Sequence, residues 1–293
     1  MPYPDYLDAK PKVIFFTDFD GTITLQDTND YITDYYGFGR EKRTSYNPHI
    51  ISGKISFRDG FQDMINSWNL PFTQVLEILK ANIQLDPGFK PFMRWARANN
   101  VPVVVVSSGM APVIKTLLSQ LVGHDLIQDI EIVANDTQLV APGHSLGAAD
   151  GWNIKYRDDS DFGHDKSLAI RPYATHIAKL PADERPTLLY AGDGVSDLSA
   201  ARETDLLFAK EGRDLVEYCE QAGVPFTTFQ DWTTILETTK DIYEGKTSVK
   251  RTAEEGLKRV RTNSIEKPPG RRHRASSLDE AAAGQFRKAH LHN

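Results

Sequence analysis

The stretch Val13–Thr22, VIFFTDFDGT, places two aspartates directly after a run of apolar residues. A short apolar run that ends in turn residues is typical of a buried β-strand. Carboxylates at the end of such a strand are costly unless something compensates their charge. Asp18 and Asp20 therefore predict a cation at this strand end, although aspartates that cap a following helix would give the same pattern.

Two further apolar runs end in polar clusters. VPVVVV leads into Ser107-Ser108-Gly109, and TLLYA leads into Gly192–Asp197, GDGVSD. Four consecutive valines favour a strand that is covered on both faces, as in a parallel sheet. Because ligands of open α/β sheets bind at the carboxyl ends of the strands, we expect the three clusters to meet at one site.

The rest of the chain alternates between apolar strand candidates and amphipathic helices, which predicts an α/β doubly wound parallel sheet. Residues 27–86 have helical patterns throughout and predict a helical insert. EIVAND, TQLVA and WNIKYRD are short strand candidates between residues 129 and 159. We expect a core made of residues 1–24 and 87–245, a helical cap at 25–86 and a disordered basic tail at 246–293.

Composition places the chain among ordinary globular proteins, with 40% hydrophobic and 25% charged residues. The single cysteine, Cys219, excludes an internal disulfide framework and favours a reducing compartment. The sequence has neither the apolar run of a signal peptide near its start nor an apolar segment long enough to span a membrane. These features predict a cytoplasmic protein without a membrane partner.

Charge is distributed unevenly along the chain. From Lys246 onward there are 12 Lys and Arg against 5 Asp and Glu, a net charge of +7, whereas the whole chain carries −6 and the remainder therefore −13. An acidic body argues against general nucleic-acid binding. The tail sequence RRHRASS suits a basophilic kinase acting at Ser277, and its basic run also suits a nuclear signal or an anionic surface.

The polar clusters together predict phosphoryl chemistry more specifically than any one of them. Asp18, Asp20 and Asp193 offer the hard oxygen ligands that Mg²⁺ prefers. Ser107 precedes a predicted helix, where backbone N–H groups favour anions. Lys166 stands at another helix start and would supply positive charge. Taken singly, each has a plainer interpretation as a turn, a helix cap or a surface lysine.

Four motifs carry a family resemblance. DFDGT, SSG, the lysine of HDKS and GDGVSD occur in an order and at spacings that resemble the motifs of the haloacid-dehalogenase (HAD) superfamily, in its phosphatase branch. DFDGTIT with QDTND is similar to the phosphoserine-phosphatase-like subgroup. GFGREKR, LDPGFK and FGHDKS resemble fungal phosphatases acting on sugar-alcohol phosphates. The resemblance covers about residues 12–240 and implies a Rossmann-like HAD core with a cap inserted after the first motif.

The resemblance also implies roles by position. Asp18 would be the nucleophile that forms an aspartyl-phosphate, and Asp20 the general acid and then base. Three residues would bind phosphate: Ser107, Ser108 and Lys166. Three would hold Mg²⁺: Asp18, Asp20 through its backbone carbonyl, and Asp193. Asp197 would lie behind them and orient a metal-bound water or the lysine.

Leaving-group recognition rests on the predicted cap. Phosphoserine phosphatases have a glutamate where this chain has Asp27, and our ungapped alignment puts Met64 where they have an arginine. We therefore expect a polyol or sugar phosphate, bound with the help of Asp27, Asn29 and the nearby Arg58, although Asp27 and Asn29 would serve equally as helix caps.

Three other functions fit parts of the pattern. A phosphoserine-type phosphatase would share the motifs. A regulatory module that accepts phosphate on aspartate without turnover would need neither Asp20 nor a cap. A phosphomutase would share the aspartyl-phosphate and yield a bisphosphate instead of free phosphate.

Overall fold

The computed structural model describes residues 10–128, 130–194, 196–213 and 215–266. Its seven-stranded sheet has the order β4-β3-β2-β1-β5-β6-β7, and neighbouring strands run parallel except for β3 and β4. The strands are β1 Val13–Thr17, β2 Val103–Met110, β3 Ile130–Leu139, β4 Trp152–Lys155, β5 Thr187–Gly192, β6 Leu206–Lys210 and β7 Phe226–Phe229. The predicted doubly wound α/β fold is confirmed.

Helices cover the sheet on both sides and also form the insert after β1. They are α1 Thr28–Tyr36, α2 Arg40–Ile51, α3 Phe57–Ser67, α4 Phe72–Asn82, α5 Phe89–Ala98, α6 Ala111–Leu121, α7 His124–Ile127, α8 Lys166–Ile177, α9 Asp197–Ala201, α10 Leu215–Ala222, α11 Trp232–Tyr243 and α12 Val249–Glu266, with a 3₁₀ turn at Ala182–Glu184. None of the helices in these described ranges is both long and apolar enough to cross a bilayer.

The alternation of side chains along β1 explains why a layer of helices covers each face of the sheet. Phe15 faces the cluster that contains α5, α6 and α11, whereas Ile14 and Phe16 face the cluster that contains α8, α9 and α10. Successive side chains of a strand point to opposite faces, so a strand that is apolar at every position must be covered twice. This burial fixes the central strands and brings their carboxyl ends to one edge.

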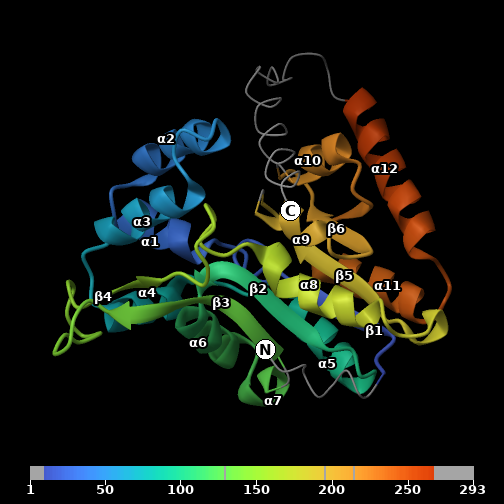
Figure 1. The fold of residues 1–293 in the computed structure, drawn as a ribbon, viewed down its shortest axis with the longest axis horizontal. Coiled ribbons are helices and arrows are strands. Elements are labelled where there is room, and N and C mark those ends of the chain that lie inside the picture. The colour runs from blue at the N-terminus through green and yellow to red at the C-terminus, as the bar shows by residue number, and fades with distance from the viewer. Residues whose placement is uncertain (1–9, 129, 195, 214, 267–293) are drawn as a thin grey trace.

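The insert between β1 and α5 is helical, as expected. Figure 1 shows α1–α4 grouped at one end of the sheet, beside β4. The chain enters and leaves the insert through paired segments, since Thr24 and Leu85 form an antiparallel bridge and Asp86 N–H donates to the Ile23 carbonyl. Trp152 of β4 packs its ring against Phe72 of α4, with centroids 4.9 Å apart.

Two expectations differ from the structure. EIVAND and TQLVA form one strand, β3, because the fully buried Asn135 does not break it: its side chain accepts from Arg157 N–H and donates to the Ser108 carbonyl. The prediction of disorder from residue 246 is wrong for α12. This helix packs on β7 through Gly256, where a Cβ would lie 2.6 Å from the Phe226 carbonyl oxygen. Residues 267–293, with Ser277, lie outside the described residues.

Candidate active site

The end of β1 carries the two predicted carboxylates into the site. Asp18 N–H donates to the Ala191 carbonyl of β5, which fixes Asp18 at the carboxyl edge of the sheet. Gly21 has φ +71°, and a Cβ there would lie 2.5 Å from Asp193 Oδ2. A residue without a side chain is therefore required for the turn after β1 to approach Asp193.

Lys166 joins two of the acidic side chains. Its Nζ donates to Asp18 Oδ1 at 2.8 Å and to Asp197 Oδ1 at 2.6 Å, and the lysine is 1% exposed. Burial lowers the pKa of Lys166, but the two carboxylates outweigh burial and raise it overall. The lysine therefore stays protonated and supplies a fixed positive charge beside Asp18.

Asp197 is the buried anchor of the fourth motif, GDGVSD. Its Oδ2 accepts the backbone N–H groups of Asp193 and Gly194, both at 3.0 Å. Its Oδ1 accepts the Tyr190 hydroxyl at 2.6 Å in addition to Lys166. Both oxygens thus serve protein donors, and this arrangement fits the predicted orienting role.

Tyr190 is a site residue that the sequence reasoning missed. It lies within the apolar run TLLYAG, where an aromatic residue is typical of core. The available signal is that a fully buried tyrosine hydroxyl needs a hydrogen-bond partner, and Asp197 is one of the polar residues that follow this strand.

Asp20 lies under the first helix of the insert. Its Oδ1 accepts Thr28 N–H at 2.8 Å, and its Oδ2 accepts the Asn29 amide at 3.3 Å. Burial, followed by the negative charges of Asp27 and Asp18, raises the pKa of Asp20 well above its ordinary value. These surroundings favour a protonated carboxyl, as a general acid needs.

The second motif forms a compact turn beside Asp20. Ser107 Oγ accepts Gly109 N–H at 3.0 Å, and a Cβ on Gly109 would lie 2.9 Å from Asp20 Oδ2. The Ser107 carbonyl is 2.8 Å from His164 Nδ1. Ser108 Oγ is buried and has no hydrogen-bond partner among the described residues. The hydroxyls of both serines stay candidates for phosphate binding.

The acidic cluster fits a hard cation. Asp18, Asp193 and Asp197 can place oxygens within 4.8 Å of one another. Burial together with neighbouring carboxylates raises the pKa of Asp193 to about 8; burial raises that of Asp18 to about 7 despite Lys166. Such shifts mark negative charge that the side chains present do not neutralise. Since Asp197 is occupied by protein donors, Asp18 and Asp193 are the side chains suited to hold Mg²⁺.

The predicted specificity residues fall in two places. Asp27 caps α1, and its Oδ1 accepts Asn29 N–H and Asp30 N–H, both at 2.8 Å. Both residues act on Asp20: the Asn29 amide donates to Asp20 Oδ2, and burial, together with the negative charge of Asp27, raises the pKa of Asp20. Arg58 instead contacts the segment between β4 and α8, and its Nη1 donates to the Asp158 carbonyl at 3.1 Å.

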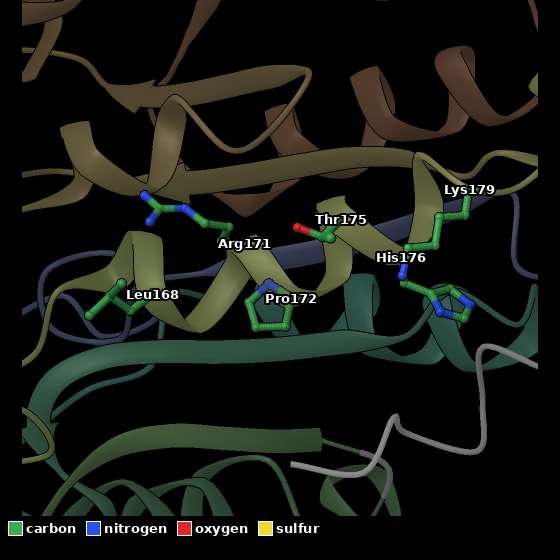
Figure 2. Close-up of a pocket in the computed structure, with 6 residues that line it drawn as sticks. All are labelled: Leu168, Arg171, Pro172, Thr175, His176 and Lys179. Atoms are coloured by element: carbon green, nitrogen blue, oxygen red, sulfur yellow. The ribbon is translucent and has the colours of Figure 1, made fainter. Parts of the chain in front are cut away.

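Cavity size does not locate the site. One cavity, about 460 Å³, runs along the outer side of α8, and Figure 2 shows the six side chains that line it. The second, about 360 Å³, lies between α3 and β4 and includes Arg58. Neither is lined by a motif residue, so the candidate active site is located from hydrogen bonding and charge.

The fold and the site together define a doubly wound α/β enzyme with a carboxylate centre at the carboxyl ends of its central strands. The chain belongs to the haloacid dehalogenase-like hydrolase family, whose model matches residues 15–202. The predicted family membership is confirmed.

Relatives and solved structures agree with this assignment. The chain is 48% identical to polyol phosphate phosphatase PYP1 of Saccharomyces cerevisiae over 81% of this chain and 97% of the relative. It is 49% identical to Pdp3-interacting factor 1 of Schizosaccharomyces pombe, over 77% of this chain and 94% of the relative. A solved phospho-aspartyl intermediate analogue of phosphoserine phosphatase matches with a TM-score of 0.54 and 18% identity, over 78% of this chain and 99% of that one, and so shares the fold.

Proposed function

We propose that this protein is a Mg²⁺-dependent phosphomonoesterase that hydrolyses a small polyol or sugar phosphate through an aspartyl-phosphate on Asp18. The observation that carries the proposal is the pairing of Asp18 with a buried, protonated Lys166, next to an Asp20 that favours its protonated form. The 48% identity to a polyol phosphate phosphatase supports the substrate class.

The first half of the reaction uses the two aspartates in different protonation states. An Asp18 oxygen attacks phosphorus, and the bond from phosphorus to the ester oxygen breaks. The departing alkoxide takes the proton of Asp20 and leaves as the alcohol. Lys166 and the Ser107 turn hold the phosphoryl oxygens, where negative charge concentrates.

The second half returns both carboxyl groups to their starting forms. Asp20, now a carboxylate, takes a proton from water as the water oxygen attacks phosphorus. The bond from phosphorus to Asp18 breaks, and inorganic phosphate leaves. Mg²⁺, held by Asp18, Asp193 and the Asp20 carbonyl, would screen the repulsion between the nucleophile and the phosphate when it is bound.

The helical insert fits the part of a cap that reads the leaving group. Asp27 and Asn29 offer acceptor and donor atoms suited to hydroxyl groups. We assign residues 25–86 to this cap and the surrounding segments to the core. The buried single cysteine supports a cytoplasmic location. Three further statements stay predictions from the sequence: that the protein enters the nucleus, that it does not bind nucleic acid generally, and that a kinase phosphorylates Ser277.

Phosphate release from a panel of esters tests the proposed substrate class. The panel holds ribitol, arabitol, sorbitol and glycerol phosphates, the matching sugar phosphates, and phosphoserine. We expect polyol or sugar phosphates to give the highest kcat/KM. Preferred turnover of phosphoserine would favour the phosphoserine-type alternative, and turnover of acyl phosphates alone would favour a regulatory phosphoacceptor.

Removal of the metal should abolish the phosphatase activity. Treatment with EDTA is expected to lower phosphate release by at least about 10²-fold, because the carboxylates of Asp18 and Asp193 then repel the anionic substrate. Addition of Mg²⁺ in excess should restore the activity. Unchanged turnover in EDTA would remove the metal from the mechanism.

Asp20→Asn should separate the two halves of the reaction. Asparagine can neither protonate the alcohol nor activate water, so we expect a loss of about 10²–10⁴-fold in kcat. With a reactive ester such as p-nitrophenyl phosphate, the phosphoenzyme should accumulate. Mass spectrometry after acid quench would then find one added phosphate on the Asp18 peptide, and its absence would contradict the role given to Asp20.

A further inference from the structure

Arg58 of α3 is bound on several sides by the loop between β4 and α8, residues 156–165. Its backbone N–H donates to the Asp161 carbonyl at 2.8 Å, and its guanidinium donates to the Asp158 carbonyl at 3.1 Å. The guanidinium also lies over the Tyr156 ring, 4.6 Å from the centroid. The Tyr156 hydroxyl donates back to the Arg58 carbonyl at 3.0 Å. Main chain and side chain of Arg58 are thus both engaged.

The β4–α8 loop is cross-linked within itself. The backbone N–H groups of Arg157 and Asp158 both donate to the Gly163 carbonyl, at 3.0 and 3.2 Å. Asp158 Oδ2 accepts Asp165 N–H at 2.9 Å, and Asp158 Oδ1 accepts Ser160 N–H at 3.0 Å. These hydrogen bonds link the two ends of the loop, residues 157–158 and residues 163–165.

The far end of the loop meets the phosphate-binding residues. His164 Nδ1 lies 2.8 Å from the Ser107 carbonyl, and this histidine is 1% exposed. Asp165 caps α8 by accepting Ser167 N–H at 2.9 Å, and Lys166 is the first residue of that helix. A hydrogen-bonded path therefore runs from Arg58 to Ser107 and Lys166.

We propose that Arg58 is a positioning residue: it clamps α3 to the β4–α8 loop and so holds Ser107 and Lys166 in place for phosphoryl transfer, without touching the substrate. This role replaces the expectation that Arg58 reads the leaving group, and it rests on the proposed function. Arg58 also lines the 360 Å³ cavity, together with Gln62 and Asn153. No motif residue lines this cavity. The clamp thus lies outside the centre whose geometry it sets.

Arg58→Ala distinguishes a clamp from a substrate contact. We expect kcat to fall by about 10–10²-fold, as for a displacement of about 1 Å at a reacting centre, with KM changed less than about twofold. The ratios of kcat/KM among polyol phosphates, sugar phosphates and p-nitrophenyl phosphate should stay constant. A loss confined to some of the esters would overturn the proposal, because only a residue that contacts the leaving group selects among them.

Hydrogen exchange gives a readout that does not depend on the substrate. In Arg58→Ala the amides of residues 156–166 should exchange faster by about tenfold or more, whereas Tyr156→Phe, which keeps the ring and loses one hydrogen bond, should show a smaller change. Arg58→Lys should recover part of the kcat. Arg94→Ala, at an exposed arginine of α5, is the matched control and should change neither quantity.

The two readouts separate this proposal from the proposed function. If no polyol or sugar phosphate is turned over, the substrate class fails, while exchange and p-nitrophenyl phosphate hydrolysis still test the clamp. Unchanged exchange in residues 156–166 of Arg58→Ala would overturn the clamp whatever the substrate is.

Discussion

Asp18→Asn is expected to lower turnover of every phosphate ester by at least about 10⁴-fold, because the substitution removes the carboxylate to which we assign the covalent intermediate. The fold should survive the change, since Lys166 keeps its 2.6 Å contact with Asp197. Phosphate release with p-nitrophenyl phosphate gives the rate, and circular dichroism gives the thermal midpoint.

A matched control separates the loss of the nucleophile from a general effect of the substitution. Asp183→Asn makes the same change at an exposed aspartate of the 3₁₀ turn and should leave both rate and midpoint unchanged. If purified Asp18→Asn kept more than about one hundredth of the wild-type rate, the covalent mechanism would be wrong.

Lys166→Met should damage both stability and activity. Removing the lysine leaves Asp18 and Asp197 buried without their cation, and breaking a buried ion pair costs about 3–5 kcal/mol. Turnover should fall by about 10³-fold or more, because the transferred phosphoryl group loses a fixed positive charge. Denaturant unfolding and phosphate release measure the two effects.

A second substitution tells these two effects apart. In Lys166→Met with Asp197→Asn one of the two uncompensated charges is removed, and the amide oxygen can still accept the backbone N–H groups of Asp193 and Gly194. We expect at least half of the lost stability to return, with no return of activity. Recovery of activity in the double variant would show that Lys166 acts only on the fold.

The sequence predicts that the three polar clusters meet, because the topology of a parallel sheet brings the ends of its central strands together. Strands that are apolar at every position must be central and parallel, and their carboxyl ends then share one edge. The structure confirms that Asp18, Lys166, Asp193 and Asp197 lie together there. Their chemical roles stay predictions.

Contacts between distant segments are what the sequence does not reveal. Arg58 and Asp158 are 100 residues apart, and no local pattern links them. Tyr190 has the local signature of core, and its role depends on where Asp197 places its carboxylate. The composition of α12 is polar and charged, and its place on the core depends on the packing of Val249, Ala253, Leu257 and Val260 and on the close approach of Gly256 to β7. Tertiary packing decides such cases over local propensity.

The pairing of the two chain segments that enter and leave the helical insert has a consequence for how such enzymes diverge. Thr24 and Leu85 are bridged, and Asp86 is anchored by accepting Gly88 N–H at 2.9 Å and Trp232 N–H at 3.2 Å. The chain therefore enters and leaves the insert at one place, where both ends lie side by side. Inserts of other lengths can be joined there without interrupting the catalytic strands. An exchanged insert must still keep the contacts of Asn29 with Asp20 and of Arg58 with the β4–α8 loop, so substrate choice can change with the insert only while these contacts are kept.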